Sequence, residues 1–321
     1  MPFRLPPLLL AWCKPLVHSL LTLLMVMVVT FALLRALPGG PFDKDKRLPP
    51  AVMEQLEAKY HLNAPVWQQL LAYSGNVLRG DLGPSYKYTS RTVQEVMSEA
   101  LPPTLILGAL SLLLGCSAGM SVALLPWLLP ARAQQTKAAL DTLASTLGLA
   151  SLSAPSFVVA GSLVLLFALE LRWLPAARLT NPMDAILPTL ALATVPFGYT
   201  VLWVRKALWQ QAGQGYLQVK HALGIQANQI TLNHQWRNAL LPWMSLMGPL
   251  AAGLLTGSFA VETIFAIPGV GKLFVLSVID RDYPVVMGIT LLYSVLLIAL
   301  NLVSESLLRW LDPRLRVEAT P

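Results

Sequence analysis

The stretch LVHSLLTLLMVMVVTFALL, residues 16–34, decides the class of this protein. It contains no Lys, Arg, Asp or Glu, and it approaches the length of about 20 apolar residues that a helix needs to cross a bilayer. The apolar run of a secretory signal peptide is shorter, about 7–15 residues. No convincing small-x-small cleavage site follows the stretch, so we predict an uncleaved first transmembrane helix.

The composition of the chain also indicates a membrane protein. Of its 321 residues, 55% are hydrophobic and only 12% are charged, whereas soluble domains carry about 25% charged residues. We attribute the net charge of +7 to orientation in the membrane and not to nucleic-acid binding. Cys13 and Cys116 lie in apolar runs without metal-type or redox-pair spacing, and we predict that both are buried.

Further apolar regions predict five more transmembrane helices, and hence an all-α integral membrane protein with six spans. These regions are Thr104–Trp127, Leu140–Leu171, Leu187–Val204, Trp243–Phe265 and Pro284–Leu308. Pro155 predicts a kinked or broken helix in the second of them. Ser153 and Ser156 beside it make this kink a candidate pore-lining site, with a kink needed only for packing as the alternative.

The polar segment 38–103 predicts a folded insertion outside the membrane. It has mixed charges and helix-like spacing at Leu48–Tyr60 and Thr92–Leu101. The short segments on the side of the N-terminus are richer in Lys and Arg than those on the opposite side. By the positive-inside rule, both termini are cytoplasmic and the insertion is external.

The longest polar stretch on the cytoplasmic side, Lys206–Leu240, separates the fourth and fifth predicted spans. Tyr216, Val219 and Leu223 share one face of a short helix, and Gly224 supplies its end. Such an amphipathic helix is typical of a docking element for another protein. A helix that lies on lipid headgroups is the alternative.

We find no motif for chemistry on this chain. The run Pro268–Lys272 is similar to a phosphate-binding loop, but Ala266 and Leu273 stand where that motif needs Gly and Ser or Thr. We interpret the run as a tight turn between spans. The histidines lack metal-ligand spacing, and no zinc-protease or esterase motif occurs, so we predict no catalytic residue and no metal site.

The loop between the fourth and fifth spans resembles a loop found in the permease subunits of ABC importers. The resemblance rests on Gly224-Ile225 followed by Asn238-Ala239-Leu240-Leu241-Pro242. The chain has Gln218-Val219-Lys220 where many members of the family have Glu-Ala-Ala. Other segments resemble the dipeptide/oligopeptide branch, and its oligopeptide B-type subunits most of all. They are Arg35–Pro41, Tyr60–Pro65, Gly80–Ser85, Arg172–Pro175, Glu262–Phe265, Pro268–Gly271, Arg281–Pro284 and Asp312–Arg314.

This resemblance implies a subunit that moves oligopeptides from the periplasm to the cytoplasm across the inner membrane. Its expected partners are a homologous second permease subunit, two ATP-binding subunits, a periplasmic substrate-binding protein, the peptide and the lipid bilayer. ATP and magnesium are expected on the ATP-binding subunits, so this chain binds no cofactor and is not an enzyme. The expected parts are residues 1–37 (cytoplasmic tail and first transmembrane helix), 38–103 (periplasmic insertion) and 104–321 (core permease domain), with a coupling loop at 206–240.

In this family the short helix of the loop is a coupling helix that docks on the ATP-binding subunit. The residues expected to dock are Gly215, Tyr216, Gln218, Val219, Lys220, Ala222, Leu223 and Gly224, and Asn238 and Pro242 are expected at the end of the loop. A permease of the same family for dipeptides, nickel, a polyamine or antimicrobial peptides is an alternative. An ion-coupled carrier is another, although we see neither inverted repeats nor a chain of midplane carboxylates.

Overall fold

The computed structural model describes residues 7–37, 64–88, 90–130, 133–225, 227–231 and 235–311. Within these ranges the regular structure is helical, apart from one isolated bridge between Pro84 and Thr92. The all-α class is therefore confirmed. The helix predicted at Leu48–Tyr60 lies outside the described residues.

Five stretches of helix in the described part are long and apolar enough to cross a membrane, and a bent pair adds a sixth when it is counted as one span. The principal helices are α1 (Pro7–Ala36), α4 (Val93–Leu128), α7 (Ile186–Ala212), α10 (Trp236–Leu255) and α13 (Tyr283–Leu311). The bent pair consists of α5 (Gln134–Ser153) and the run of α6 (Ser156–Leu163) and η2 (Val164–Glu170). The shorter elements are α3 (Val66–Leu78), η3 (Pro182–Ala185), α8 (Gly215–Ala222), α9 (Ala227–Ile230), α11 (Phe259–Ile264) and α12 (Val270–Ile279).

The predicted break at Pro155 is confirmed. The helices on its two sides are inclined by 98° to one another. Ala154 is extended (φ −83°, ψ 117°), as expected for a residue that precedes proline. The carbonyl of Pro155 then accepts the N–H of Val158 at 2.9 Å and begins α6.

The helix predicted at Thr92–Leu101 is confirmed, and it continues without a break into the predicted second span. The two form one helix, α4, which starts at Val93 and runs through the apolar region from Thr104. Thr92 and Glu95 form a capping box, in which Oγ1 of Thr92 accepts the N–H of Glu95 and the Glu95 carboxylate accepts the N–H of Thr92. The proline pair at 102–103 lies inside the helix and does not end it.

The chain divides into two compact units. The first comprises residues 1–102 and 268–298, and the second comprises 103–267 and 299–321. These units are defined by contacts within the chain. The predicted parts 1–37, 38–103 and 104–321 are defined by position relative to the membrane, and they stay a prediction. In the first unit, the beginning of α4 packs against α12 and the beginning of α13 through Val93, Val270 and Ile289.

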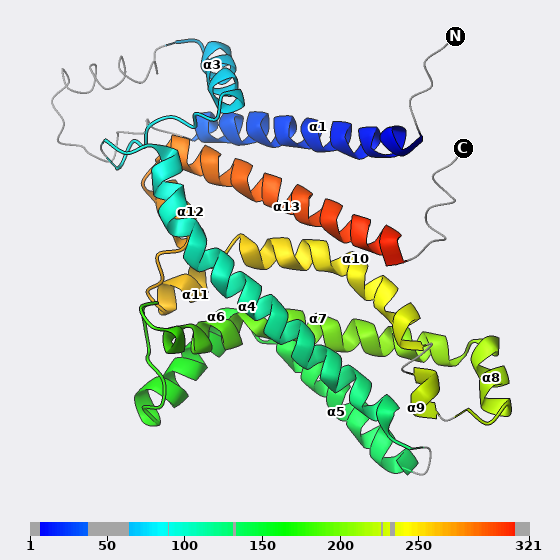
Figure 1. Ribbon diagram of the computed structural model, residues 1–321. Coiled ribbons are helices and arrows are strands. Elements are labelled where there is room, and N and C mark those ends of the chain that lie inside the picture. The colour runs from blue at the N-terminus through cyan, green and yellow to red at the C-terminus, as the bar shows by residue number, and fades with distance from the viewer. Residues whose placement is uncertain are drawn as a thin grey trace, which may run out of the picture. The chain divides into compact units, whose positions relative to one another are not determined.

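Small residues let the helices of the second unit approach one another closely. A Cβ atom on Gly115 would lie 2.6 Å from the carbonyl oxygen of Ala193, and one on Gly119 would lie 2.8 Å from that of Phe197. On α7, a Cβ atom on Gly198 would lie 2.7 Å from Cγ of Leu152 in α5. Figure 1 shows α5 and α7 (both green) side by side, as these contacts require. Backbone approach at small residues is the usual way in which helices associate in lipid.

The prediction of two buried cysteines is corrected for Cys116, which is half-buried in α4, with Sγ 3.8 Å from the sulfur of Met247. Partial exposure of an apolar side chain costs little when the surrounding solvent is lipid. The side chain of Cys13 lies outside the described residues.

Candidate functional site

Helix α8 occupies the loop between α7 and α10, where the sequence predicts a docking helix (Figure 1). It begins at Gly215, three residues after the end of α7 at Ala212. Gly224 follows it with φ +78°, a left-handed conformation that suits glycine. The N–H of Ile225 donates to the carbonyl of Lys220 at 3.2 Å, which is the outer hydrogen bond of a Schellman ending.

The described apolar side chains of this loop helix face outward. Val219 is 61% exposed and Leu223, directly after the helix, is 74% exposed. Ala222 and Gly215 are also exposed, and Lys220 is half-buried. The side chains of Tyr216, Gln218 and His221 lie outside the described set. The helix therefore presents an apolar surface that the described part of this chain does not cover.

The far end of the predicted loop is helical. Helix α10 begins at Trp236, so Asn238 is an exposed residue of its first turn and Pro242 lies in its interior. At the near end, α7 continues to Ala212. Helices α7 and α10 therefore extend into the predicted loop 206–240 and leave 213–235 between them, while the loop's boundary at the membrane stays a prediction.

The kink residues lie on the surface of the second unit. Ser153 is exposed and donates from Oγ to the carbonyl of Leu149 at 2.8 Å, while Pro155 is exposed and Ser156 is half-buried. The packing against Gly198 described above gives the kink a structural role. Its role in lining a pore stays a prediction.

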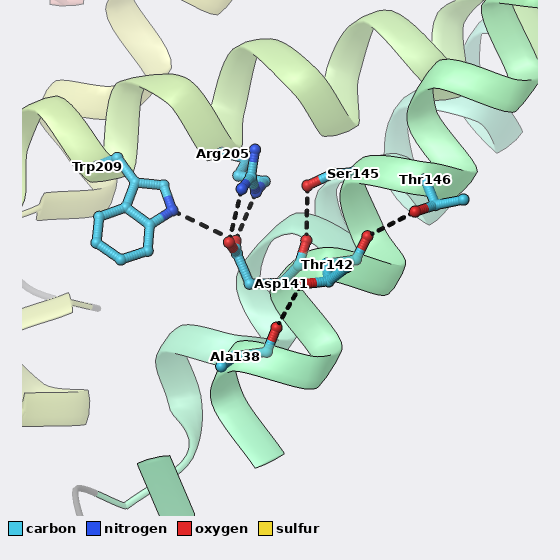
Figure 2. A network of polar contacts seen from close by, with 7 residues as sticks. All are labelled: Ala138, Asp141, Thr142, Ser145, Thr146, Arg205 and Trp209. Carbon is cyan, nitrogen blue, oxygen red and sulfur yellow. Dashed lines mark hydrogen bonds and ion pairs between the residues drawn. The ribbon is translucent and has the colours of Figure 1, made fainter. Parts of the chain in front are cut away.

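An ion pair that the sequence analysis missed joins α5 to α7 (Figure 2). Arg205 donates from Nε and Nη2 to the two carboxylate oxygens of Asp141 at 2.5 and 2.6 Å. The indole of Trp209, one turn farther along α7, donates to Asp141 Oδ1 at 3.3 Å. The sequence does show an acidic and a basic residue near the ends of two predicted spans. Because they are 64 residues apart, however, no local pattern indicates that they are in contact.

Asp282 organises the first unit from a fully buried position before α13. Its carboxylate accepts the hydroxyl of Ser85 and the backbone N–H groups of Tyr86 and Lys87, the latter two at 3.1 and 3.2 Å. Lys87 also pairs with the half-buried carboxylate of Asp280, and this hydrogen bond raises the pKa of Lys87. The motifs at 80–85 and 281–284 are therefore two halves of one structural clamp.

Two further groups are buried without an evident chemical role. Glu262 in α11 accepts the hydroxyl of Thr104 in α4 at 3.0 Å. In α3, burial raises the pKa of the Tyr73 hydroxyl, which lines a cavity of about 310 Å³ in the first unit. Among the described residues, no group of three or more His, Cys, Asp or Glu side chains is placed to hold a metal ion.

Comparison with known proteins places this arrangement in a family. Residues 115–317 match the family described as binding-protein-dependent transport system inner membrane component. The dipeptide transport system permease protein DppB of Bacillus subtilis is 36% identical over 296 residues, which are 92% of this chain and 94% of that protein. The oligopeptide transport system permease protein OppB of Haemophilus influenzae is 34% identical over 309 residues (94% and 98%), and OppB of Escherichia coli K12 is 35% identical over 301 residues (92% and 95%). The chain therefore belongs to the family of binding-protein-dependent transport system inner membrane components, and it is a multi-pass membrane protein and a translocation component of such a system.

Proposed function

We propose that this chain is a permease subunit of an ATP-driven importer that carries peptides from the periplasm to the cytoplasm through the inner membrane. The observation that carries the proposal is helix α8, with exposed Val219 and Leu223 in the loop between two spanning helices. An apolar surface at that place is suited to a groove on a soluble partner. The dipeptide and oligopeptide permeases to which the chain is similar support peptides as the cargo.

The proposed assembly contains a second, homologous permease subunit, two ATP-binding subunits and a periplasmic substrate-binding protein. ATP and magnesium bind to the ATP-binding subunits, and this chain binds no cofactor and catalyses no reaction. Both termini are cytoplasmic, consistent with Arg205, Lys206, Lys220 and Arg237 near the loop that carries α8.

In the proposed mechanism, ATP binding brings the ATP-binding subunits together, and α8 moves with them. The motion passes into α7, since only Gly213 and Gln214 separate the two helices. Alternating access then follows from the rocking of packed helices, which behave as two-state elements and not as continuously deformable ones.

The test is purification of the full chain from its native membrane in detergent, with measurement of the bound ATP-binding subunits and their ATP hydrolysis. In the double variant Val219→Asp/Leu223→Asp, two charges replace the apolar surface, and we expect loss of the bound subunits and of peptide uptake. The matched control is Leu78→Asp on α3, where an equally apolar side chain is 88% exposed outside the loop. Full retention of the ATP-binding subunits and of uptake by the double variant would refute the proposal.

Cargo is tested separately, by uptake of labelled peptides of two to five residues into cells that carry only this importer. Competition among these peptides, with no effect of nickel or a polyamine, is the expected result. Uptake of nickel or a polyamine, without uptake of any peptide, would assign the chain to another cargo of the same family.

A further inference from the structure

A cavity of about 600 Å³ lies in the second unit, where α4 ends, α5 begins and α7 ends. Its polar lining includes Trp127, Gln134, Lys137, Asp141, Trp209 and Gln235, together with two threonines, Thr142 and Thr231. These residues belong to the ends of membrane-spanning helices, on the side that the proposed topology places in the cytoplasm. None of the described residues of α8 lines this cavity.

The cavity has an excess of positive charge. Among the described residues of its lining, Asp141 is the only one with a carboxylate, and both of its oxygens accept from Arg205. Lys137 lies one turn before Asp141 on α5, yet no carboxylate among the described residues lies within ion-pair distance of its ammonium group. The pair of Asp141 and Arg205 is neutral, so Lys137 leaves the site with one net positive charge.

The lining of the cavity also carries hydrogen-bond donors. The buried Nε1–H of Trp127 has no acceptor among the described residues. The Trp127 ring is held edge-on against Trp209, with the two centroids 5.2 Å apart. Oε1 of the buried Gln235 accepts the hydroxyl of Thr231 at 2.9 Å, which leaves the Gln235 amide N–H groups as donors. A ligand that accepts hydrogen bonds from Lys137, Trp127 and Gln235 needs several acceptor oxygens, and a negative charge suits the Lys137 ammonium group.

We propose that this cavity binds the phosphate of an anionic phospholipid from the cytoplasmic leaflet. Two tryptophans and a lysine at helix ends are typical of the membrane interface, where headgroups lie. Basic pockets between helices on this side of a membrane bind anionic headgroups. An exposed apolar face of α5 adjoins the cavity. Leu143, directly after the cavity residue Thr142, is 52% exposed, and Leu147, one turn farther on the same face, is 41% exposed. A lipid can place its phosphate in the cavity and an acyl chain along this face, whereas a free phosphate uses only the cavity.

The proposal is tested on the detergent-purified full chain by native mass spectrometry, with phosphatidylglycerol, phosphatidylcholine and inorganic phosphate as separate probes. We expect saturable binding of phosphatidylglycerol in preference to phosphatidylcholine. Lys137→Gln is expected to weaken that binding on the order of fivefold, which corresponds to the loss of one basic contact to an anionic lipid. Trp127→Phe, which keeps the ring and removes the N–H, is expected to weaken it as well.

Two control variants make the test specific. Lys206→Gln removes a lysine of α7 that stacks on Trp203 and does not line the cavity, and it should leave binding unchanged. Lys137→Arg retains the charge and should retain binding. Equal affinity for the two lipids, or equal losses in Lys137→Gln and Lys206→Gln, would overturn the proposal. Displacement of the lipid by millimolar inorganic phosphate would assign the cavity to a soluble anion instead. None of these outcomes depends on transport, so they are independent of the test of the proposed function.

Discussion

At the scale of single residues, the pair of Asp141 and Arg205 is the polar contact that holds α5 to α7 most directly. Asp141→Asn removes the charge that compensates Arg205 and weakens two charge-assisted hydrogen bonds. We expect a loss of about 1.5–3 kcal/mol, the usual range for hydrogen bonds to charged groups. Thermal unfolding of the purified protein in detergent tests this expectation, and the loss of stability should lower the midpoint temperature of unfolding.

The matched control for this prediction is the exposed pair of Glu305 and Arg309, spaced i, i+4 on α13. Glu305→Gln should change stability by only about 0.3–0.5 kcal/mol, since solvent screens an exposed helical pair. Equal losses in Asp141→Asn and Glu305→Gln would mean that the former pair does not join the helices.

The buried carboxylate of Asp282 supports a second prediction at this scale. Asp282→Asn keeps the shape of the side chain but offers one acceptor oxygen where three donors converge. We therefore expect faster amide hydrogen exchange and protease cleavage at 85–88. Asp280→Asn removes only the charge that pairs with the Lys87 side chain, and it should leave both rates close to those of the wild type. Unchanged exchange in Asp282→Asn would refute the role of Asp282 as a clamp.

At the scale of elements, close approach of backbones predicts which glycines tolerate a methyl group. Gly198→Ala would place Cβ 2.7 Å from Leu152, and overpacking of this kind typically costs about 1–3 kcal/mol. Gly253→Ala in α10 meets nothing within 4 Å and should be neutral or stabilising, because alanine favours helix. Unfolding midpoints of the two variants test the difference, and a Gly198→Ala protein as stable as Gly253→Ala would contradict the packing of α5 against α7.

The end of α8 gives another prediction for an element. At Gly224 a side chain meets no atom within 4 Å, so a substitution acts only through the positive φ angle. Gly224→Pro cannot adopt that angle and should misplace the end of the helix and uncouple transport, and bulky residues should act in the same direction. Gly215→Ala, which requires no positive φ, should preserve uptake. The measurement is peptide uptake at matched expression. Normal uptake by Gly224→Pro would show that transport does not require the positive φ angle at the end of α8.

The elements also show how far the sequence predicts this fold. Long apolar runs predict the spanning helices and proline predicts the break at 155, because both signals are local. Hydropathy does not predict helix ends, and Val93 begins α4 well before the apolar core of that span. The Asp141–Arg205 pair could not be predicted at all, since it depends on which faces of α5 and α7 meet. The spacing also predicts the short helix of the loop with exposed Val219 and Leu223, and its docking to a partner stays a prediction.

At the scale of the whole molecule, the proposed orientation predicts which positions reagents can reach. With Cys13 and Cys116 replaced by Ser, a cysteine at the exposed Leu78 should react with a membrane-impermeant maleimide added outside spheroplasts. A cysteine at the exposed Gly215 should react only after the membrane is permeabilised. The opposite labelling pattern would invert the topology and place α8 outside the cell.

The glycine contacts of α7 have a mechanical consequence. The helix is 27 residues long, about 40 Å at 1.5 Å per residue. Pro196 lies inside the helix and removes one of its backbone hydrogen bonds. Helix α4 packs directly against this position, since a Cβ atom on Gly115 would lie 2.6 Å from Cγ of Pro196. Gly198 presses against α5 on the neighbouring turn. If α8 moves as proposed, we therefore expect α7, supported on two sides, to transmit that displacement along its length instead of absorbing it as bending.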